Sequence, residues 1–215
     1  MRVLDRGCLV TVSVLVGAGV ARADRYESSL HVQAVGGLAQ TGDVDGRGLS
    51  SAPLGGLEVR ASYATSDWYQ YDLAVTGFGT GTAGFAAAEF TLPGGETVAG
   101  PFEVGSAGLR VDGGVTVRLG VQVIPTFRLG VGFQARRIGS PTVETSVLEV
   151  DAHRPGRIER ELVGLGSVGL DYRFNRRLIA GAAVGGVYAV PVGGVGFRSL
   201  EATAHVAYYW YPLWF

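Results

Sequence analysis

After about residue 24, apolar and polar residues alternate along much of the chain, and many of the polar residues are charged. The segment Leu57 to Tyr63 shows this most clearly, because Glu58 and Arg60 stand between apolar neighbours. A period of two predicts β-strands, whose side chains point alternately to the two faces of a sheet. A soluble β-sandwich would bury aliphatic residues on its inner face, so charged residues at these positions disfavour that fold. We therefore expect strands with one apolar face and one charged face.

The same pattern recurs in eight segments, which we expect to be the strands of one sheet. They lie within residues 26–34, 57–63, 69–76, 102–119, 127–136, 167–173, 178–188 and 199–206. The connections between them alternate in length. We expect long ones at 40–54, 79–101 and 138–156, and short turns at 64–67, before Pro125 and at 175–177. The segment 178–188 is almost entirely small and apolar, so its alternation does not assign the two faces.

Aromatic residues gather near the ends of the expected strands. Outer-membrane barrels have short turns on one side, longer loops on the other, and aromatic girdles at both interfaces. We expect a girdle beside the short turns that contains Tyr63, Trp68, Tyr69, Tyr71, Phe127, Tyr172, Tyr208 and Trp210. Near the other rim we expect Phe78, Phe133, Tyr188 and Phe197.

These features predict an all-β fold, an antiparallel up-and-down transmembrane β-barrel of about eight strands with short periplasmic turns and long external loops. An eight-stranded barrel is only wide enough to be filled by side chains, so we expect a hydrogen-bonded, ion-paired lumen and no large pore. The expected lumen residues are Glu58, Arg60, Asp72, Arg110, Asp112, Arg118, Arg128, Arg136, Asp171, Arg173, Glu201 and His205. Inward glycines, such as Gly130, Gly132 and Gly169, would leave room for the arginines.

Residues 1–23 have the pattern of a cleaved signal peptide, with early basic residues, an apolar run over 8–20 and small residues up to Ala23. We expect export, cleavage after Ala23, and a barrel over residues 24–215. The remaining chain has no apolar stretch long enough for a membrane helix. The single cysteine, Cys8, excludes a disulfide framework, and the formal net charge of −1 does not indicate a nucleic-acid partner.

With these features, the chain resembles the small bacterial outer-membrane β-barrels typified by the OmpA transmembrane domain and OmpX-like proteins. The resemblance rests on the overall pattern and on the aromatic C-terminal segment His205 to Phe215. It implies the outer membrane of a Gram-negative bacterium as the location, with outer-membrane lipid and lipopolysaccharide as partners. It also implies that the assembly machinery recognises an insertion signal at Tyr209, Tyr211, Leu213 and Phe215. We expect a monomer with a structural or surface-interaction role. The sequence does not identify its external ligand.

The alternation gives two incompatible registers near the C-terminus. Counting forward from Leu200 points Trp210 toward lipid, whereas counting back from Phe215 points Tyr209 there. Pro212 has no backbone N–H to donate to a sheet, so we expect a bulge or a strand end close to it.

Catalytic and metal-binding patterns are weak. His31, His153 and His205 are the only histidines that could act as general bases, and their spacing fits neither a catalytic H-x-S arrangement nor a metal site. We expect no enzyme and no cofactor or metal. Two alternatives stay open: an outer-membrane enzyme that modifies lipid, and a soluble secreted ligand-binding barrel of the lipocalin type. The second would place apolar residues inside and polar residues outside.

The expected external loops also carry charge. Acidic residues at 40–54 and 138–156 could meet divalent cations, although solvated charge is the simpler interpretation. Arg154 and Arg157 could meet the phosphates of lipopolysaccharide.

Overall fold

The computed structural model describes residues 26–42, 49–66, 68–91, 95, 97–139, 142–144, 149–151, 157–191 and 196–210. The expected signal peptide lies outside the described residues. Among these residues, no helix is long and apolar enough to cross a membrane.

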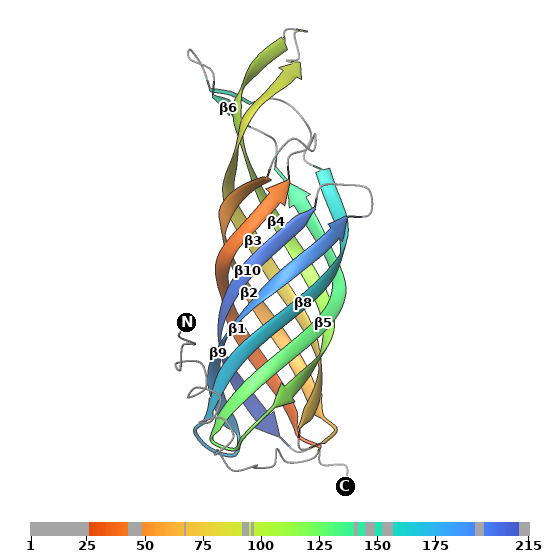
Figure 1. Cartoon of the computed structure of the whole chain (residues 1–215), viewed down its shortest axis with the longest axis vertical. Helices are drawn as coiled ribbons and strands as arrows, with labels where there is room; N and C mark the ends of the chain where they lie inside the picture. The colour runs from red at the N-terminus through yellow and green to blue at the C-terminus, as the bar shows by residue number, and fades with distance from the viewer. Residues whose placement is uncertain are drawn as a thin grey trace, which may run out of the picture.

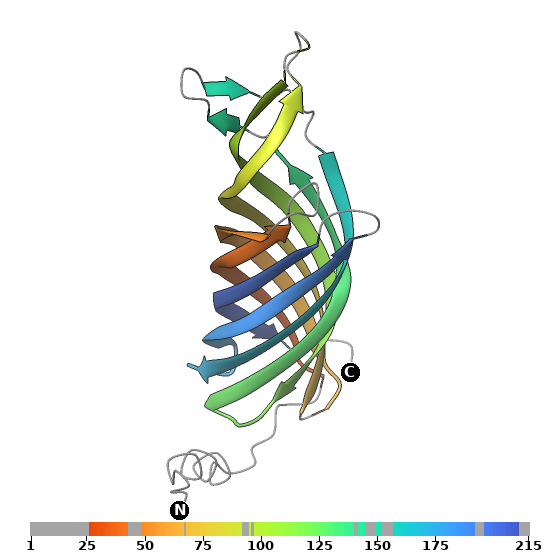
Figure 2. The same cartoon turned by 45° about the horizontal axis from the view of Figure 1, so that its top comes forward.

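Eight long strands form a closed barrel in which every strand runs antiparallel to its neighbours (Figure 1). They are β1 (Ser28–Gly42), β2 (Leu49–Ala64), β3 (Tyr69–Thr91), β4 (Thr97–Arg118), β5 (Val123–Ile138), β8 (Arg157–Arg173), β9 (Leu178–Pro191) and β10 (Phe197–Trp210). Each long strand pairs with the next one along the chain, and β10 closes the sheet against β1, with Trp210 opposite Ser28. The tilted view shows the strands winding around the axis (Figure 2). The predicted antiparallel up-and-down barrel is therefore confirmed.

The two ends of the barrel differ less in loop length than the sequence suggested. The expected loop at 40–54 is wrong in most of its length, because β1 runs to Gly42 and β2 begins at Leu49. The segment 79–101 is also mostly strand, since β3 and β4 continue pairing up to Thr91 opposite Thr97. Backbone hydrogen bonds hold this hairpin without regular side-chain alternation, and its register shifts twice along the way. The alternation rule therefore missed it.

The hairpin of β3 and β4 rises beyond the rest of the barrel wall (Figure 1). Pairing of β2 with β3 ends at Thr80, so the part of β3 beyond it pairs with β4. Phe85 stacks on Phe102 across this hairpin with ring centroids 5.0 Å apart. The short strands β6 (Thr142–Glu144) and β7 (Glu149–Asp151) pair with each other, and β6 also pairs with β4. The expected loop at 138–156 thus contains two short strands.

The short turns at the opposite end lie where the sequence placed them. Side-chain acceptors organise two of them. The Ser66 hydroxyl accepts the backbone N–H of Tyr69 at 3.1 Å, and the Asn175 side chain accepts that of Leu178 at 2.9 Å. Such contacts replace a backbone turn bond and favour Ser and Asn in tight turns.

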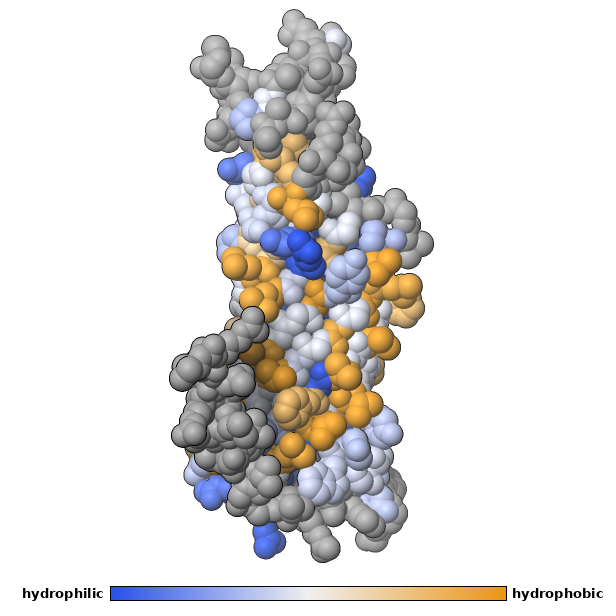
Figure 3. All heavy atoms as spheres, in the orientation of Figure 1, coloured by the Kyte–Doolittle hydropathy of each residue, from blue (hydrophilic) through white to orange (hydrophobic). Residues whose placement is uncertain are grey.

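The outer wall is apolar and the interior is mostly polar, which reverses the arrangement of a soluble protein. Exposed aliphatic and aromatic side chains occur on all eight long strands. On the face drawn in Figure 3, apolar residues gather around the middle of the barrel. The structure also assigns β9, whose facing the sequence left open: Ile179 and Val187 point inward, whereas Leu178, Val184 and Tyr188 point outward. This polarity is opposite to that of the lipocalin-type alternative.

Among the described residues, two apolar clusters lie inside the barrel, at different heights. The upper cluster, toward the β3–β4 hairpin, consists of Val35, Ala39, Leu54, Phe78, Val163, Val187, Ala189 and Phe197. The lower cluster, near the short turns, consists of Ile124, Ile179, Ala207 and Tyr209. Phe78 and Phe197 were expected in an aromatic girdle near the other rim, and their place in that girdle is wrong, because both rings point inward, with centroids 5.8 Å apart. Alternation sets these two residues on the inner face of β3 and β10.

Candidate functional site: the charged interior of the barrel

Between the two apolar clusters, buried charges from all sides of the barrel meet. Arg128 on β5 reaches two carboxylates from neighbouring strands, and its Nε donates to Asp72 Oδ1 at 2.9 Å. Its Nη2 contacts Asp72 and Asp112 together. Thr116 Oγ1 donates to the other oxygen of Asp72 at 2.9 Å. One guanidinium thereby links β3, β4 and β5, which is the forked geometry that only Arg provides.

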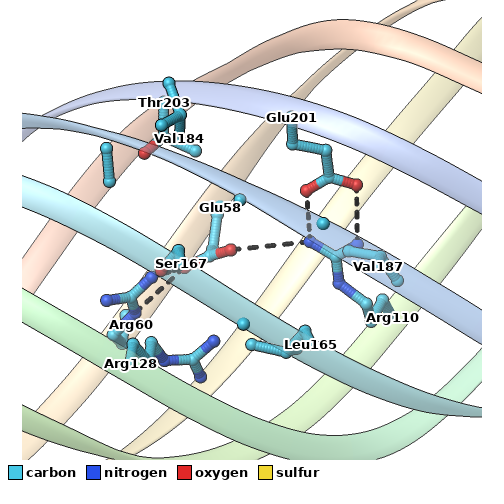
Figure 4. A pocket seen from close by; sticks show the side chains of 14 residues that line it. Glu58, Arg60, Arg110, Arg128, Leu165, Ser167, Val184, Val187, Glu201 and Thr203 are labelled. Carbon is cyan, nitrogen blue, oxygen red and sulfur yellow. Dashed lines mark hydrogen bonds and ion pairs between the residues drawn. The ribbon is translucent and has the colours of Figure 1, made fainter. Parts of the chain in front are cut away.

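A second arginine crosses the interior. Arg110 on β4 donates from Nη1 and Nη2 to the two carboxylate oxygens of Glu201 on β10, at 2.9 and 3.0 Å (Figure 4). Its guanidinium also lies 3.5 Å from Asp112 and 3.8 Å from Glu58. All of these side chains are at most 8% exposed. Their mutual pairing offsets the large cost of removing each charge from water.

Glu58 collects hydrogen bonds from three neighbours. Gln33 on β1 donates to it at 2.8 Å, Arg60 on the same strand at 2.7 Å, and Thr76 on β3 at 3.0 Å. Arg60 Nε adds a fourth hydrogen bond at 3.0 Å, so both carboxylate oxygens accept hydrogen bonds, and Arg110 adds a positive charge at 3.8 Å. Asp112, which contacts both Arg128 and Arg110, joins the two arginine clusters, and Glu58 connects Arg110 with Arg60.

A third group lies near the short turns. Arg118 and Arg173 approach the same oxygen of Glu27, at 3.8 and 3.4 Å. Both guanidiniums also lie over the ring of Tyr209, with centroid distances of 5.0 and 5.9 Å. A cation over an aromatic face gains electrostatic attraction, most of all where water is excluded. This lower group couples the residues before β1 to the last strand.

Histidine and hydroxyl groups lie just above it. His31 Nε2 is 3.0 Å from Ser29 Oγ and 3.2 Å from Ser62 Oγ. His205 Nε2 is 3.1 Å from Asp171 Oδ1, and the two imidazole rings are 5.5 Å apart. A hydroxyl beside an imidazole is one arrangement that can activate a serine nucleophile, but these groups are buried inside the barrel.

Two small cavities lie among the described residues of the interior. One cavity, beside Arg110, Glu201 and Gly185, measures about 40 Å³ as the space open to the centre of a water molecule (Figure 4). A second, beside His31 and His205, measures about 30 Å³. A single water needs roughly 10–15 Å³ on this measure. Each cavity therefore has room for a few water molecules and for no larger ligand.

Comparison with solved structures places this architecture among known barrels. Neisserial surface protein A aligns with a TM-score of 0.54 and 14% identity, over 84% of this chain and 96% of that one. The chain has the fold of a small outer-membrane β-barrel. The attachment invasion locus protein Ail of Yersinia pestis also aligns, with a TM-score of 0.49 and 12% identity over 87% and 100% of the two chains. No protein-family model and no curated protein matches the sequence.

All twelve residues expected in the lumen of this outer-membrane-type barrel lie on its inner face. Most of them are brought together in the groups above. Arg136 is separate and higher: it pairs with Glu161 at 2.9 Å and lies over the ring of Phe197 at 4.9 Å. Gln134 donates to the same Glu161 at 2.7 Å. Among the described residues, no cluster of His, Cys, Asp and Glu could hold a metal ion.

Several interior residues were not singled out from the sequence. Glu27 lies in the first expected strand but was not assigned a role, and Glu161 lies in the part of β8 that the expected strand did not include. Gln33 belongs to the polar face of the first expected strand but was not assigned a role. Extending the alternation of β8 upward from Asp171 would have found Glu161, because both have odd numbers and face inward. Glu27 would have been found in the same way, because it shares the odd numbering of Ser29, His31 and Gln33, which face inward.

Glycines make room for this network, at partly different positions from those expected. A Cβ at Gly114 would lie 3.1 Å from the guanidinium of Arg128, and a Cβ at Gly132 would lie 2.6 Å from the Cβ of Asp112. Gly130 and Gly169 instead face Leu165 and the pair Thr126 and Ala183, respectively, so they do not make room for arginines.

The expected aromatic girdle residues are all exposed on the outer wall. Their exposed fractions range from 38% to 54% for Tyr63, Trp68, Tyr69, Tyr71, Phe127, Tyr172, Tyr208 and Trp210. Tyr71 pairs with Tyr63 across β2 and β3, and Tyr208 stacks on Trp210. They lie on the half of the barrel that carries the short turns.

The structure decides between the two registers expected for the C-terminal strand, as far as Trp210. Alternation from Leu200 continues through Trp210, so Trp210 points outward and Tyr209 points into the barrel, where it is 1% exposed. The register counted back from Phe215 is therefore wrong for Tyr209. The other expected insertion-signal residues, Tyr211, Leu213 and Phe215, lie outside the described residues, as does the expected irregularity near Pro212.

Proposed function

We propose that this chain is a non-conducting β-barrel of the Gram-negative outer membrane, with a structural or surface-interaction role in the envelope. The observation that carries the proposal is the sealed interior. An ion-paired network fills the middle of the barrel, and apolar clusters stand at both of its ends. An ion would have to pass the paired charges and the upper apolar cluster, and each of these steps is unfavourable.

The outer surface supports the membrane location. Aliphatic residues that are more than half exposed, such as Leu57, Leu73, Leu129, Val131 and Leu200, would face water in a soluble barrel. Such a large continuous apolar surface is unfavourable in water but matches the hydrocarbon core of a bilayer. Export through a signal peptide at 1–23, assembly by the outer-membrane machinery and a monomeric state belong to the same proposal.

The lipid-modifying alternative is less well supported. Its strongest candidate is the contact of His31 with Ser29 and Ser62, and all three side chains are buried inside the barrel. Lipid substrates would reach an outer-membrane enzyme from the outer wall or from its rim. The same side chains donate and accept within the polar network, together with Gln70, which donates to both hydroxyls.

Conductance measurements test the proposal. The mature chain, refolded and inserted into planar bilayers, should give no stable current steps. The insertion control is a gel shift on heating together with protection of the barrel from protease. Large, reproducible porin-like steps would overturn the non-conducting barrel. A chain that fractionates as a soluble protein without detergent would overturn the membrane location.

A further inference from the structure

Asp171 on β8 differs from the other carboxylates inside the barrel. Among the interior side chains that the structure describes, it is the one carboxylate that has no arginine as an ion-pair partner. It faces His205 on β10 instead, with His205 Nε2 3.1 Å from Asp171 Oδ1, and both side chains are buried. A buried carboxylate is costly without a positive partner. The charge of His205 therefore decides whether Asp171 has one.

A glycine lets these two side chains meet. Gly181 on β9 pairs with Asp171 on one side and with His205 on the other, so the three residues form one row across three strands. A Cβ at Gly181 would lie 2.2 Å from Asp171 Oδ1 and 2.9 Å from His205 Cε1. Any other residue would therefore fill the space in which the two side chains approach each other. Their contact joins β8 to β10, which the backbone does not pair directly.

The attraction between Asp171 and His205 depends on charge. Although the two atoms are 3.1 Å apart, neither His205 Nε2 nor Asp171 Oδ1 has a partner with hydrogen-bond geometry. In this arrangement a neutral imidazole would offer the carboxylate neither a charge nor a hydrogen bond. Neutralising one partner of a buried ion pair leaves the other charge uncompensated. The imidazolium form of His205 is therefore the form that stabilises Asp171.

The neighbouring histidine has different partners. His31 Nε2 lies 3.0 and 3.2 Å from the hydroxyl oxygens of Ser29 and Ser62, and a hydroxyl can donate to a neutral imidazole nitrogen. Among the described residues, no carboxylate forms an ion pair with His31. The two imidazole rings are 5.5 Å apart, so two positive charges there would repel each other. The proton should therefore reside on His205.

Other charged and titratable groups surround this pair, and they come from every strand that faces it except β9, whose residues 178–191 carry no charge. They are His31 on β1, Arg60 and Glu58 on β2, Asp72 on β3, Arg118 on β4, Arg128 on β5, Arg173 on β8, Tyr209 on β10, and Glu27 before β1. The arginines oppose a further positive charge. Each of them already faces a carboxylate, which offsets much of its effect on His205.

We propose that Asp171 and His205 form a proton-dependent clamp that ties β8 to β10 across β9. The clamp is closed while His205 is protonated, and it opens when loss of the proton leaves Asp171 without a counter-charge. Histidine changes its charge between about pH 5 and 8, so the clamp responds to pH in the range that an exposed cell envelope meets. Its contribution to stability is present at the acidic end and is lost as the pH rises.

Thermal unfolding tests the sign of this dependence. The full mature chain is refolded into detergent micelles, and the midpoint of its heat-dependent gel shift is measured from about pH 5 to 9. Wild type should melt about 5 °C or more above H205Q at the acidic end, and the two midpoints should converge at the alkaline end. A difference that stays constant, or that grows with pH, would overturn the clamp.

Nitrogen NMR of the imidazole tests the charge directly. The chain has three histidines, so H31Q/H153Q leaves His205 as the single one. In this background, the imidazole should have both nitrogens protonated at about pH 6. Adding D171N should move its deprotonation to lower pH, by about one unit or more, because the counter-charge is gone. A neutral imidazole over the whole range, or the same titration with and without D171N, would overturn the pairing.

The matched control for the melting series is H31Q, which removes the other interior histidine. It should keep the pH-dependent difference from its own H205Q derivative, whereas a difference that disappears in H31Q would assign the effect to His31 and overturn the clamp. These results are independent of the proposed function. A chain that shows the expected titration but gives porin-like current steps would keep the clamp and overturn the non-conducting barrel.

Discussion

Arg110 and Glu201 join opposite walls of the barrel. In the closed sheet, β4 and β10 are four strands apart in either direction, and the two hydrogen bonds of 2.9 and 3.0 Å between these side chains cross the interior. Backbone pairing alone fixes only neighbouring strands. A bidentate ion pair across the diameter therefore sets the spacing between strands that the sheet does not join directly.

Removing one partner of this pair should be costly. Arg110→Met leaves the buried carboxylate of Glu201 without its main counter-charge, and we expect a loss of about 3–5 kcal/mol in the free energy of unfolding. Urea unfolding in phospholipid vesicles measures it. The double variant R110M/E201M removes both charges and should lose clearly less than the sum of the two single variants. Simple additivity would contradict a direct interaction.

Arg128 should not be replaceable by lysine. The guanidinium contacts Asp72 and Asp112 at once, whereas an ammonium group offers a single compact charge without the forked geometry. We expect Arg128→Lys to lower the free energy of unfolding by about 1.5–3 kcal/mol. The exposed-turn substitution Arg177→Lys serves as the control and should change stability little. Equal stability of R128K and wild type would show that charge alone suffices.

The upper apolar cluster should act as a seal. Phe78 and Phe197 are 7% and 2% exposed and pack against each other inside the barrel. Replacing both with Ala should create a cavity, lower stability by about 3–5 kcal/mol for each ring, and allow small current steps in planar bilayers. The control Phe133→Ala removes an outward ring of the same size and should give no current steps. Unchanged conductance in F78A/F197A would assign the seal to the ion-paired layer alone.

The ring of Tyr209 should matter more than its hydroxyl. Arg118 and Arg173 both lie over the ring face, and Phe offers the same face. We therefore expect Tyr209→Phe to fold and melt close to wild type, whereas Tyr209→Ala should lower the melting temperature. Thermal unfolding followed by the heat-dependent gel shift measures both. Equal destabilisation by the two variants would assign the effect to the hydroxyl group.

Deleting Phe215 tests the expected insertion signal independently of barrel stability. If the assembly machinery reads the proposed signal, assembly in cells should fall, while refolding of the purified chain into vesicles should stay near wild type. The folded fraction in isolated outer membranes measures the first effect. Normal assembly of the deletion variant would argue against a signal at this residue.

Alternation predicted the direction of side chains better than the extent of strands. It placed Asp72, Arg128 and Glu201 correctly on the inner face, because a strand with a period of two can face the interior in only two ways. It did not recognise the upper part of β3 and β4, where small residues replace the alternating pattern. The alternation pattern also could not predict which charged side chains pair with each other. The contact between Arg110 and Glu201, for example, depends on closure of the barrel and on the tilt of its strands.

The meeting of Glu27, Arg118, Arg173 and Tyr209 has a consequence for assembly kinetics. Glu27 precedes β1, and Tyr209 is the next-to-last residue of β10, so these two come from opposite ends of the barrel sequence. The two guanidiniums come from β4 and β8, in between. Until the last strand docks, they lack the aromatic face that covers them in the finished barrel. Docking of β10 and burial of these charges therefore coincide, so we expect closure of the barrel to be coupled to the formation of this group.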